Sequence, residues 1–340
     1  MLTRVLSGLI VGGMLIATSC APAASPTATP VVSPTPTALT HLTVAYSNIS
    51  ATILPLWVAK EAGIFEKHGL DVDLQYAASA TSVAAVLSGQ MQMASVGLSE
   101  VLGAIAGGAD LVIVANQVPA YTYVFEVAPG IQSASDLKGK SIGISRPGSS
   151  SDIGTRVVLK KYGIDPDNDV TLVQTGSVTE RGAAMNSGAI QGAVASPPET
   201  LAAERLGWHP IFDLAGLGLP AVTLGVIVQR GYRDGNRPIV QAYIDALVEG
   251  TARMRSDRAL AIDLLKTNMK IDSDEDLNVT YDYYTSQALM PAYPYPQQSQ
   301  FADTLEILGK SNENLLKLDM ATLIDASFVK SAEERGVANN

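Results

Sequence analysis

The chain has 340 residues, of which 47% are hydrophobic and 16% are charged, and its formal net charge is −10 at pH 7. The apolar content excludes a disordered chain, and the excess of acids argues against nucleic acid as a partner. The single cysteine, Cys20, excludes a disulfide framework and a cysteine metal site, and the three scattered histidines have no metal-ligand spacing, so we expect no metal.

The N-terminal segment has the features of a secretory signal. Arg4 precedes an apolar run over residues 5–16, which is too short for a membrane span of ~20 residues. The sequence Ala17-Thr18-Ser19-Cys20 resembles a bacterial lipobox, although Ala17 stands where leucine is usual. We therefore expect a lipoprotein signal peptide over residues 1–19 and lipidation of Cys20, the alternative being an ordinary secretory signal.

Residues 20–40 are rich in Pro, Thr, Ala and Ser and carry no charge, which predicts an extended tether. No later segment is long and apolar enough to be a second span. The expected location is the extracytoplasmic face of the bacterial cell membrane, with a lipid anchor at Cys20.

From His41 onward, short β runs alternate with helices of about ten residues, the pattern of parallel βαβ units. A helix is expected from Leu54, with Pro55 in its first turn, a break at Gly63 and an end at Gly69. Strands are expected over residues 41–47, 70–77, 91–97, 110–118, 140–145, 169–176, 189–196 and 222–230, and further helices over 80–89, 99–108, 151–163, 178–188 and 238–255.

A weak internal repeat relates residues 79–97 to residues 176–196. Each segment has a Ser or Thr cluster, a helix, a Ser-Gly stop and a short strand that ends in small residues. The β runs at residues 124–130 and 222–230 are suited to two crossings between lobes. A single continuous sheet is the alternative that the periodicity leaves open.

Turns rich in Ser and Gly lie where strands lead into helices, at residues 46–48, 79–82, 99–100, 146–152 and 176–177. Helix N-termini at the carboxyl ends of parallel strands can hold a polar or anionic group, and five such turns favour a ligand site over plain helix caps. Arg146 is the one cation in these turns, and it pairs either with a ligand or with Asp152 or another nearby acid. The tyrosine-rich stretch 281–296 is either an aromatic lid or a packed loop.

Catalytic motifs are not met. Gly139-Lys140-Ser141 has the end of a phosphate-binding loop, but Ala134 replaces its first glycine and a strand follows instead of a helix. Residues 216–221 imitate a dinucleotide fingerprint but also lead into a strand. Nothing in the sequence argues for an enzyme.

Five segments together, residues 16–20, 55–74, 87–97, 135–152 and 185–199, resemble the extracytoplasmic solute-binding proteins of ABC importers of the nitrate, sulfonate and taurine type. The same family includes binders of thiamine-pyrimidine precursors and of flavins. The resemblance implies an α/β, type 2 periplasmic-binding fold with two Rossmann-like lobes joined by two crossing strands. It gives lobe 1 as residues 41–125 and 222–340 and lobe 2 as residues 126–221.

The resemblance also implies a monomer that captures a small-molecule ligand by hinge closure and delivers it to an ABC permease. Carried over by position, the ligand-binding residues are Tyr46, Ser47, Asn48, Thr52, Ser79, Thr81, Gly97, Ser99, Ser149, Ser150, Ser151, Ser177 and Glu199. Tyr121 and Arg146 are counted as candidate ligand contacts as well.

Glu199 departs from a purely anion-binding lining and could accept hydrogen bonds from an amine or a ring N–H. The ligand therefore stays open between a sulfonate-like anion and a pyrimidine- or flavin-type vitamin or precursor. Two other functions share the expected fold. One is a pyrimidine-synthase-like enzyme, whose cysteine-rich iron motif this chain lacks, and the other is a ligand sensor for a signalling receptor.

Overall fold

The computed structural model describes residues 38–286 and 288–339. The expected signal peptide, Cys20 and nearly all of the tether lie outside these residues. Among the helices that the structure describes, none has the length and apolar character needed to cross a membrane. In the same part of the chain, no group of three or more His, Cys, Asp or Glu side chains could hold a metal ion.

Two five-stranded sheets form the framework. The first sheet has the order β2-β1-β3-β10-β4, and the second has the order β7-β6-β8-β5-β9. The strands of the first sheet are β1 (Thr40–Tyr46), β2 (Leu70–Tyr76), β3 (Met93–Val96), β4 (Leu111–Ala120) and β10 (Pro220–Gln229). Those of the second are β5 (Val124–Val127), β6 (Ser141–Ile144), β7 (Thr171–Gln174), β8 (Gly192–Ala195) and β9 (His209–Asp213).

The two sheets share one topology. In the first, β1 pairs in parallel with β2 and β3, and β10 runs antiparallel between β3 and β4. In the second, β6 pairs in parallel with β7 and β8, and β5 runs antiparallel between β8 and β9. The predicted α/β fold of two lobes is confirmed, and the predicted repeat corresponds to the third strand of each sheet, β3 and β8, with the helix before it. A single continuous sheet is excluded.

We call each sheet with its packed helices a lobe. The chain passes from the first sheet to the second through residues 121–123 and returns through residues 214–219. The β runs that were expected to make these crossings are strands within the sheets, β5 and β10. β9 was not predicted, because its sequence HPIFD contains a proline and lacks an alternating pattern.

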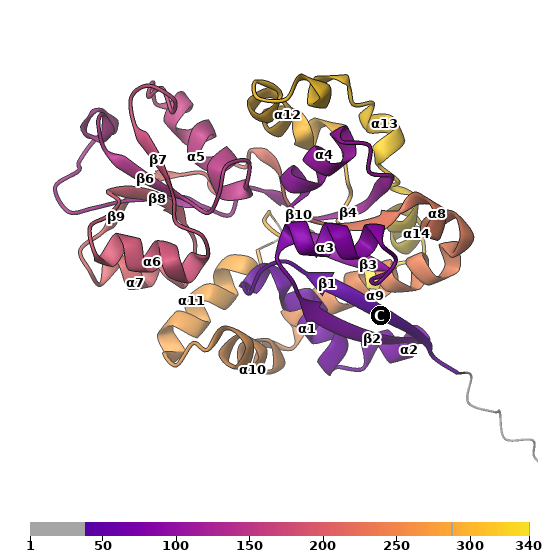
Figure 1. The fold of residues 1–340 in the computed structure, drawn as a ribbon. Coiled ribbons are helices and arrows are strands. Elements are labelled where there is room, and N and C mark those ends of the chain that lie inside the picture. The colour runs from indigo at the N-terminus through magenta and orange to yellow at the C-terminus, as the bar shows by residue number, and fades with distance from the viewer. Residues whose placement is uncertain (1–37, 287, 340) are drawn as a thin grey trace, which may run out of the picture. The chain divides into compact units, whose positions relative to one another are not determined.

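Helices cover both faces of each sheet (Figure 1). On one face of the first sheet lie α1 (Leu54–Glu61), α2 (Ile64–Lys67), α9 (Arg237–Ser256), α10 (Arg258–Met269), α11 (Asp274–Tyr284) and α14 (Ser327–Glu334). On the other lie α3 (Ser79–Leu87), α4 (Leu98–Ala106), α12 (Ala302–Gly309) and α13 (Met320–Leu323). The second sheet packs against α5 (Ser150–Lys161) on one face and α6 (Val178–Asn186) and α7 (Glu199–Glu204) on the other. The short α8 (Arg230–Gly235) follows β10.

The segment after β1 shows how the sequence sets local structure. Pro55 lies in the first turn of α1, where a missing N–H costs nothing. Gly63 and Gly69 have φ of 67° and 79°, a conformation that side chains disfavour, and they bracket α2. The predicted two-step return is therefore confirmed, and it brings the chain back into β2 beside β1.

One carboxyl group is buried in the second lobe without compensation. Glu126, on β5, is 0% exposed, and neither of its carboxyl oxygens has a hydrogen-bond partner among the described residues. Burial raises the pKa of Glu126 to about 7, and the nearby carboxylates Glu204 and Glu199 add to the rise. The folded protein therefore holds a proton on Glu126 that the unfolded chain releases at lower pH.

This group predicts a specific pH dependence of stability. The pKa of Glu126 is higher in the folded state than its usual value of 4.5, so stability is lost as the pH rises from about 4.5 through 7. The side chain of Glu126→Gln cannot ionise, so the variant should gain stability over the parent as the pH rises. The difference in free energy of unfolding between the variant and the parent should be about 2 to 3 kcal/mol larger at pH 8 than at pH 5. Urea unfolding at both pH values measures this difference. The exposed Glu61→Gln is the matched control, and an unchanged pH dependence in Glu126→Gln would contradict the prediction.

Candidate functional site

Aromatic side chains gather at the carboxyl ends of the first two strands. Tyr46 is the last residue of β1, and Tyr76 is the last residue of β2. The ring of Tyr46 meets Trp57 of α1 edge to face at 6.2 Å between centroids, and it meets Tyr76 at 5.9 Å. Tyr76 is 55% exposed, so this cluster presents an aromatic surface at the strand ends.

The loop after β1 is held by its own polar groups. The backbone N–H of Ser47 donates to the carbonyl of Ser95 at 3.0 Å. The side-chain oxygen of Asn48 accepts from Ser50 at 2.8 Å and from Thr52 at 3.2 Å. Three of the predicted ligand residues, Ser47, Asn48 and Thr52, therefore shape this loop at the sheet edge.

Two helices of the first lobe that begin at the strand ends, α3 and α4, lack side-chain caps. The N-cap residues of α3 and α4 are Ala78 and Gly97, and neither makes a side-chain cap bond within the described residues. At α4 the carboxylate of Glu100 lies over this end of the helix, where its own backbone N–H and Ser79 lower the pKa of the carboxyl. Burial raises the pKa of Glu100, and Arg146 acts in the opposite direction.

Glu100 also joins the two lobes. Its carboxylate forms an ion pair with the guanidinium of Arg146, in the loop between β6 and α5. The side chains of Glu100 and Arg146 are 18% and 40% exposed, so the pair is partly shielded from water. Of the acids near Arg146, its partner is therefore Glu100 of the other lobe and not Asp152.

Two helices of the second lobe, α5 and α6, are capped by side chains of their own first turns. The hydroxyl of Ser149 accepts from the backbone N–H of Asp152 at the start of α5. The hydroxyl of Ser177 accepts from Glu180 at the start of α6, and the Glu180 carboxylate accepts from the N–H of Ser177 in return. Ser149 and Ser177 therefore act as helix caps.

A buried ion pair lies behind these caps. The side chains of Arg181 on α6 and Glu199 on α7 are only 3% and 7% exposed. The guanidinium donates to both carboxylate oxygens, at 3.0 and 2.7 Å, and to the hydroxyl of Ser145 at 3.1 Å. Burial raises the pKa of the Glu199 carboxyl, and Arg181 opposes that rise. Because both oxygens accept guanidinium hydrogens, we treat Glu199 as ionised.

Two tyrosines lie near the Glu100–Arg146 and Arg181–Glu199 ion pairs. Burial raises the pKa of the Tyr123 phenol, which feels Arg181 and the carboxylates of Glu199 and Glu100 as well. Tyr284 of α11 hydrogen-bonds the hydroxyl of Ser196 at 2.6 Å, a contact between the lobes. Tyr284 is 2% exposed, so part of the tyrosine-rich stretch is packed helix rather than lid.

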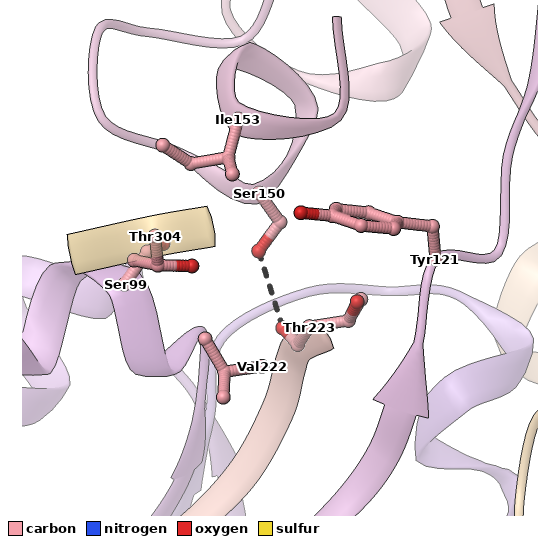
Figure 2. A pocket seen from close by; sticks show the side chains of 7 residues that line it. All are labelled: Ser99, Tyr121, Ser150, Ile153, Val222, Thr223 and Thr304. Carbon is pink, nitrogen blue, oxygen red and sulfur yellow. Dashed lines mark hydrogen bonds between the residues drawn. The ribbon is translucent and has the colours of Figure 1, made fainter. Parts of the chain in front are cut away.

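A small cavity lies where the lobes meet (Figure 2). It has a volume of about 10 Å³, room for roughly one water molecule. The hydroxyl of Ser150 donates across the junction to the carbonyl of Thr223 at 3.2 Å, and Tyr121 directs its hydroxyl toward Ser150. Its lining residues are Ser99, Tyr121, Ser150, Ile153, Val222, Thr223 and Thr304.

The structure brings six of the predicted residues to the contact between the lobes. Ser99, Tyr121 and Ser150 line the cavity, while Ser79, Gly97 and Arg146 surround Glu100. Ser151, which accepts from the N–H of Ser145 at 2.9 Å, joins the loop that carries Arg146. Thr81 and Ser177 are exposed.

Glu100, Tyr123, Arg181, Ser196 and Tyr284 also belong to this candidate site, and the sequence did not single them out as ligand-binding residues. A signal was present for two of them. Arg181 is a cation in the first turns of a helix, where the helix dipole disfavours it. Glu100 occupies the first turn of the helix after β3, as Glu199 does after β8, so the internal repeat relates the two acids.

The fold and this arrangement define a class: two-lobed proteins of the periplasmic-binding fold, with polar groups of both lobes at the strand ends. The family model described as NMT1/THI5 like matches residues 50–259, well over half of the chain. The chain belongs to the NMT1/THI5-like family.

Solved structures show the same fold at low identity. The periplasmic aliphatic sulphonate-binding protein SsuA of Escherichia coli is 22% identical, with a TM-score of 0.69 over 84% of this chain and 92% of that one. The periplasmic nitrate-binding protein NrtA of Synechocystis is 13% identical, with a TM-score of 0.64 over 87% of this chain and 89% of that one.

Curated relatives match over shorter segments. YtlA of Bacillus subtilis, named as a binding protein, is 33% identical over 141 residues, which cover 40% of this chain and 42% of that protein. A binding protein of Brucella abortus is 33% identical over 118 residues, which cover 34% of this chain and 36% of that protein. The match thus spans about two fifths or less of these relatives' length.

The buried pair of Arg181 and Glu199 predicts that a nearly isosteric substitution of Glu199 strongly lowers the free energy of unfolding. Glu199→Gln leaves the charge of Arg181 buried without its partner, which costs about 3 to 5 kcal/mol. Asp282→Asn breaks the exposed pair between Asp282 and Arg258, and it should cost no more than about 1 kcal/mol. Urea unfolding of the two variants measures the contrast. Equal effects would show that the Arg181–Glu199 pair is not desolvated as described.

Proposed function

We propose that this protein is the solute-binding component of an ABC uptake transporter and no enzyme. It captures a small organic ligand between its lobes and delivers it to a membrane permease. The observation that carries the proposal is the meeting of both lobes at the strand ends, where Glu100 of the first lobe pairs with Arg146 of the second. The family membership, the fold of the solved neighbours and the names of the curated relatives support it.

The charges at the strand ends favour one class of ligand. Glu100 is paired with Arg146, and Glu199 is paired with Arg181, so these four groups contribute no net charge. A sulfonate or nitrate ligand is favoured by an unpaired cation or an open helix N-terminus, whereas a neutral ligand needs neither. Carboxylate and hydroxyl oxygens accept hydrogen bonds from ring N–H groups.

The exposed ring of Tyr76, supported by Tyr46 and the buried Trp57, adds an aromatic group on which a ligand ring can stack. Of the two classes that the sequence left open, we therefore propose a neutral or zwitterionic nitrogen heterocycle of the pyrimidine or flavin type. E. coli SsuA is named for aliphatic sulphonate binding, a ligand class that the paired arginines of this chain disfavour.

Ligand entry requires motion, because the cavity at the junction has room for about one water molecule only. We propose that the lobes separate about residues 121–123 and 214–219, the two segments between the sheets. On this proposal the second lobe spans residues 124–213, and the first lobe holds the described residues on either side of it. The protein acts as a monomer.

Full-length protein purified from its own host should retain a ligand, because tight binders keep theirs. Mass spectrometry of the small molecules released on denaturation identifies it, and a ring with N–H donors is expected. Adding that compound back at a hundredfold excess over Kd stabilises the fold by about 2.7 kcal/mol, which raises Tm. The finding of a sulfonate would overturn the ligand class, and turnover of the compound would overturn the binding function.

We also propose that Cys20 is lipidated and anchors the protein at the extracytoplasmic face of the membrane. Cys20→Ala should move the protein from the membrane fraction to the soluble extracytoplasmic fraction, because the lipid chains supply the attachment. Immunoblotting of the fractions measures the shift, and Ser19→Ala serves as the control. A Cys20→Ala protein that stays with the membrane would refute the anchor.

A further inference from the structure

The carboxylate of Glu100 occupies the place where a helix N-terminus holds an anion. α4 has nine residues, and its cap residue is Gly97, which has no side chain. Glu100 folds back over this end so closely that a Cβ atom on Gly97 would lie 2.2 Å from its Oε2. The first turn of α4 is therefore closed by an acid from its own chain.

The surroundings of this carboxylate are those of a built anion site. The guanidinium of Arg146 reaches it from the second lobe, and Ser79, the first residue of α3, lies close enough to lower the pKa of the carboxyl. Ser99, in the same turn as Glu100, is 2% exposed, and its hydroxyl has no partner among the residues that the structure describes. A cation and Ser79 thus lie at one helix N-terminus, and the unpartnered hydroxyl of Ser99 lines the cavity beside it.

We propose that Glu100 is a specificity-determining residue that acts as an internal anion and excludes anionic ligands. Its carboxylate takes the hydrogen bonds and the cation that a sulfonate or carboxylate ligand would need. Such a ligand would meet a like charge and find Arg146 already neutralised. This inference deepens the proposed function, since it names what the same site rejects, but its test does not require the native ligand.

A second glutamate, Glu180, distinguishes the effect of a glutamate that folds over a helix N-terminus from the effect of burial and an arginine partner. Glu180 folds over the N-terminus of α6 in the same way, and a Cβ atom on Gly176 would lie 2.2 Å from its Oε2. Glu180 is exposed, and none of the ion pairs between described residues includes it. Glu100 and Glu180 therefore both fold over a helix N-terminus. Only Glu100 of these two is shielded from water and paired with an arginine of the other lobe.

The test is a gain of binding. Full-length Glu100→Ala should bind methanesulfonate, because it frees Arg146, Ser79 and the N–H groups of α4. At tenfold excess over Kd, its Tm should rise by about 2 °C along a saturable curve. The parent protein and Glu180→Ala should show no saturable rise in Tm with methanesulfonate. Chloride at equal ionic strength is the reference for all three proteins.

A double variant identifies the cation. Glu100→Ala/Arg146→Ala should lose the gained binding, which a merely loosened fold would retain. If Glu100→Ala does not fold, Glu100→Gln preserves the side-chain volume, leaves Arg146 without a counter-charge and should also gain binding. The proposal is overturned if the folded variants show no gain, if Glu180→Ala gains equally, or if the parent protein binds methanesulfonate more tightly than they do. Each protein is unfolded and refolded before the titration to release any retained ligand, so these outcomes do not depend on a native ligand.

Discussion

The cost of removing a charge from water constrains the arrangement of the strand ends. Glu199 and Arg181 are both buried, and each is tolerable only because the other is present. Their bidentate contact fixes α6 against α7, and the third guanidinium nitrogen holds Ser145 at the end of β6. The loop that begins there carries Arg146, so the buried pair also positions the cation that reaches Glu100 of the first lobe.

The two acids occupy equivalent places in a duplicated plan. Each lies in the first turn of the helix that follows the third strand of its sheet, β3 for Glu100 and β8 for Glu199. Both partner arginines come from the second lobe. One pair is therefore internal to a lobe and the other spans two lobes, so the same local motif stabilises a fold in one place and a contact between lobes in the other.

The order of strands and helices was predictable from the sequence, because buried parallel strands and their glycine stops leave strong local patterns. Pro55, Gly63 and Gly69 were assigned correctly for this reason. The site was predicted only in part, since turn composition marks helix starts but not partners. Arg146 was recognised as a candidate, but its pairing with Glu100 joins residues of different lobes, and local sequence carries no record of it.

The position of β10 has a consequence for the order of folding. β10 lies between β3 and β4, although both of those strands precede it by more than a hundred residues in the chain. The second lobe is one continuous segment and can assemble before β10 has been made. The first sheet cannot, because its two halves touch only through a strand that arrives late, and such long-range pairing is slow. An emerging chain therefore exposes unpaired edges of β3 and β4 until residue 229 is available.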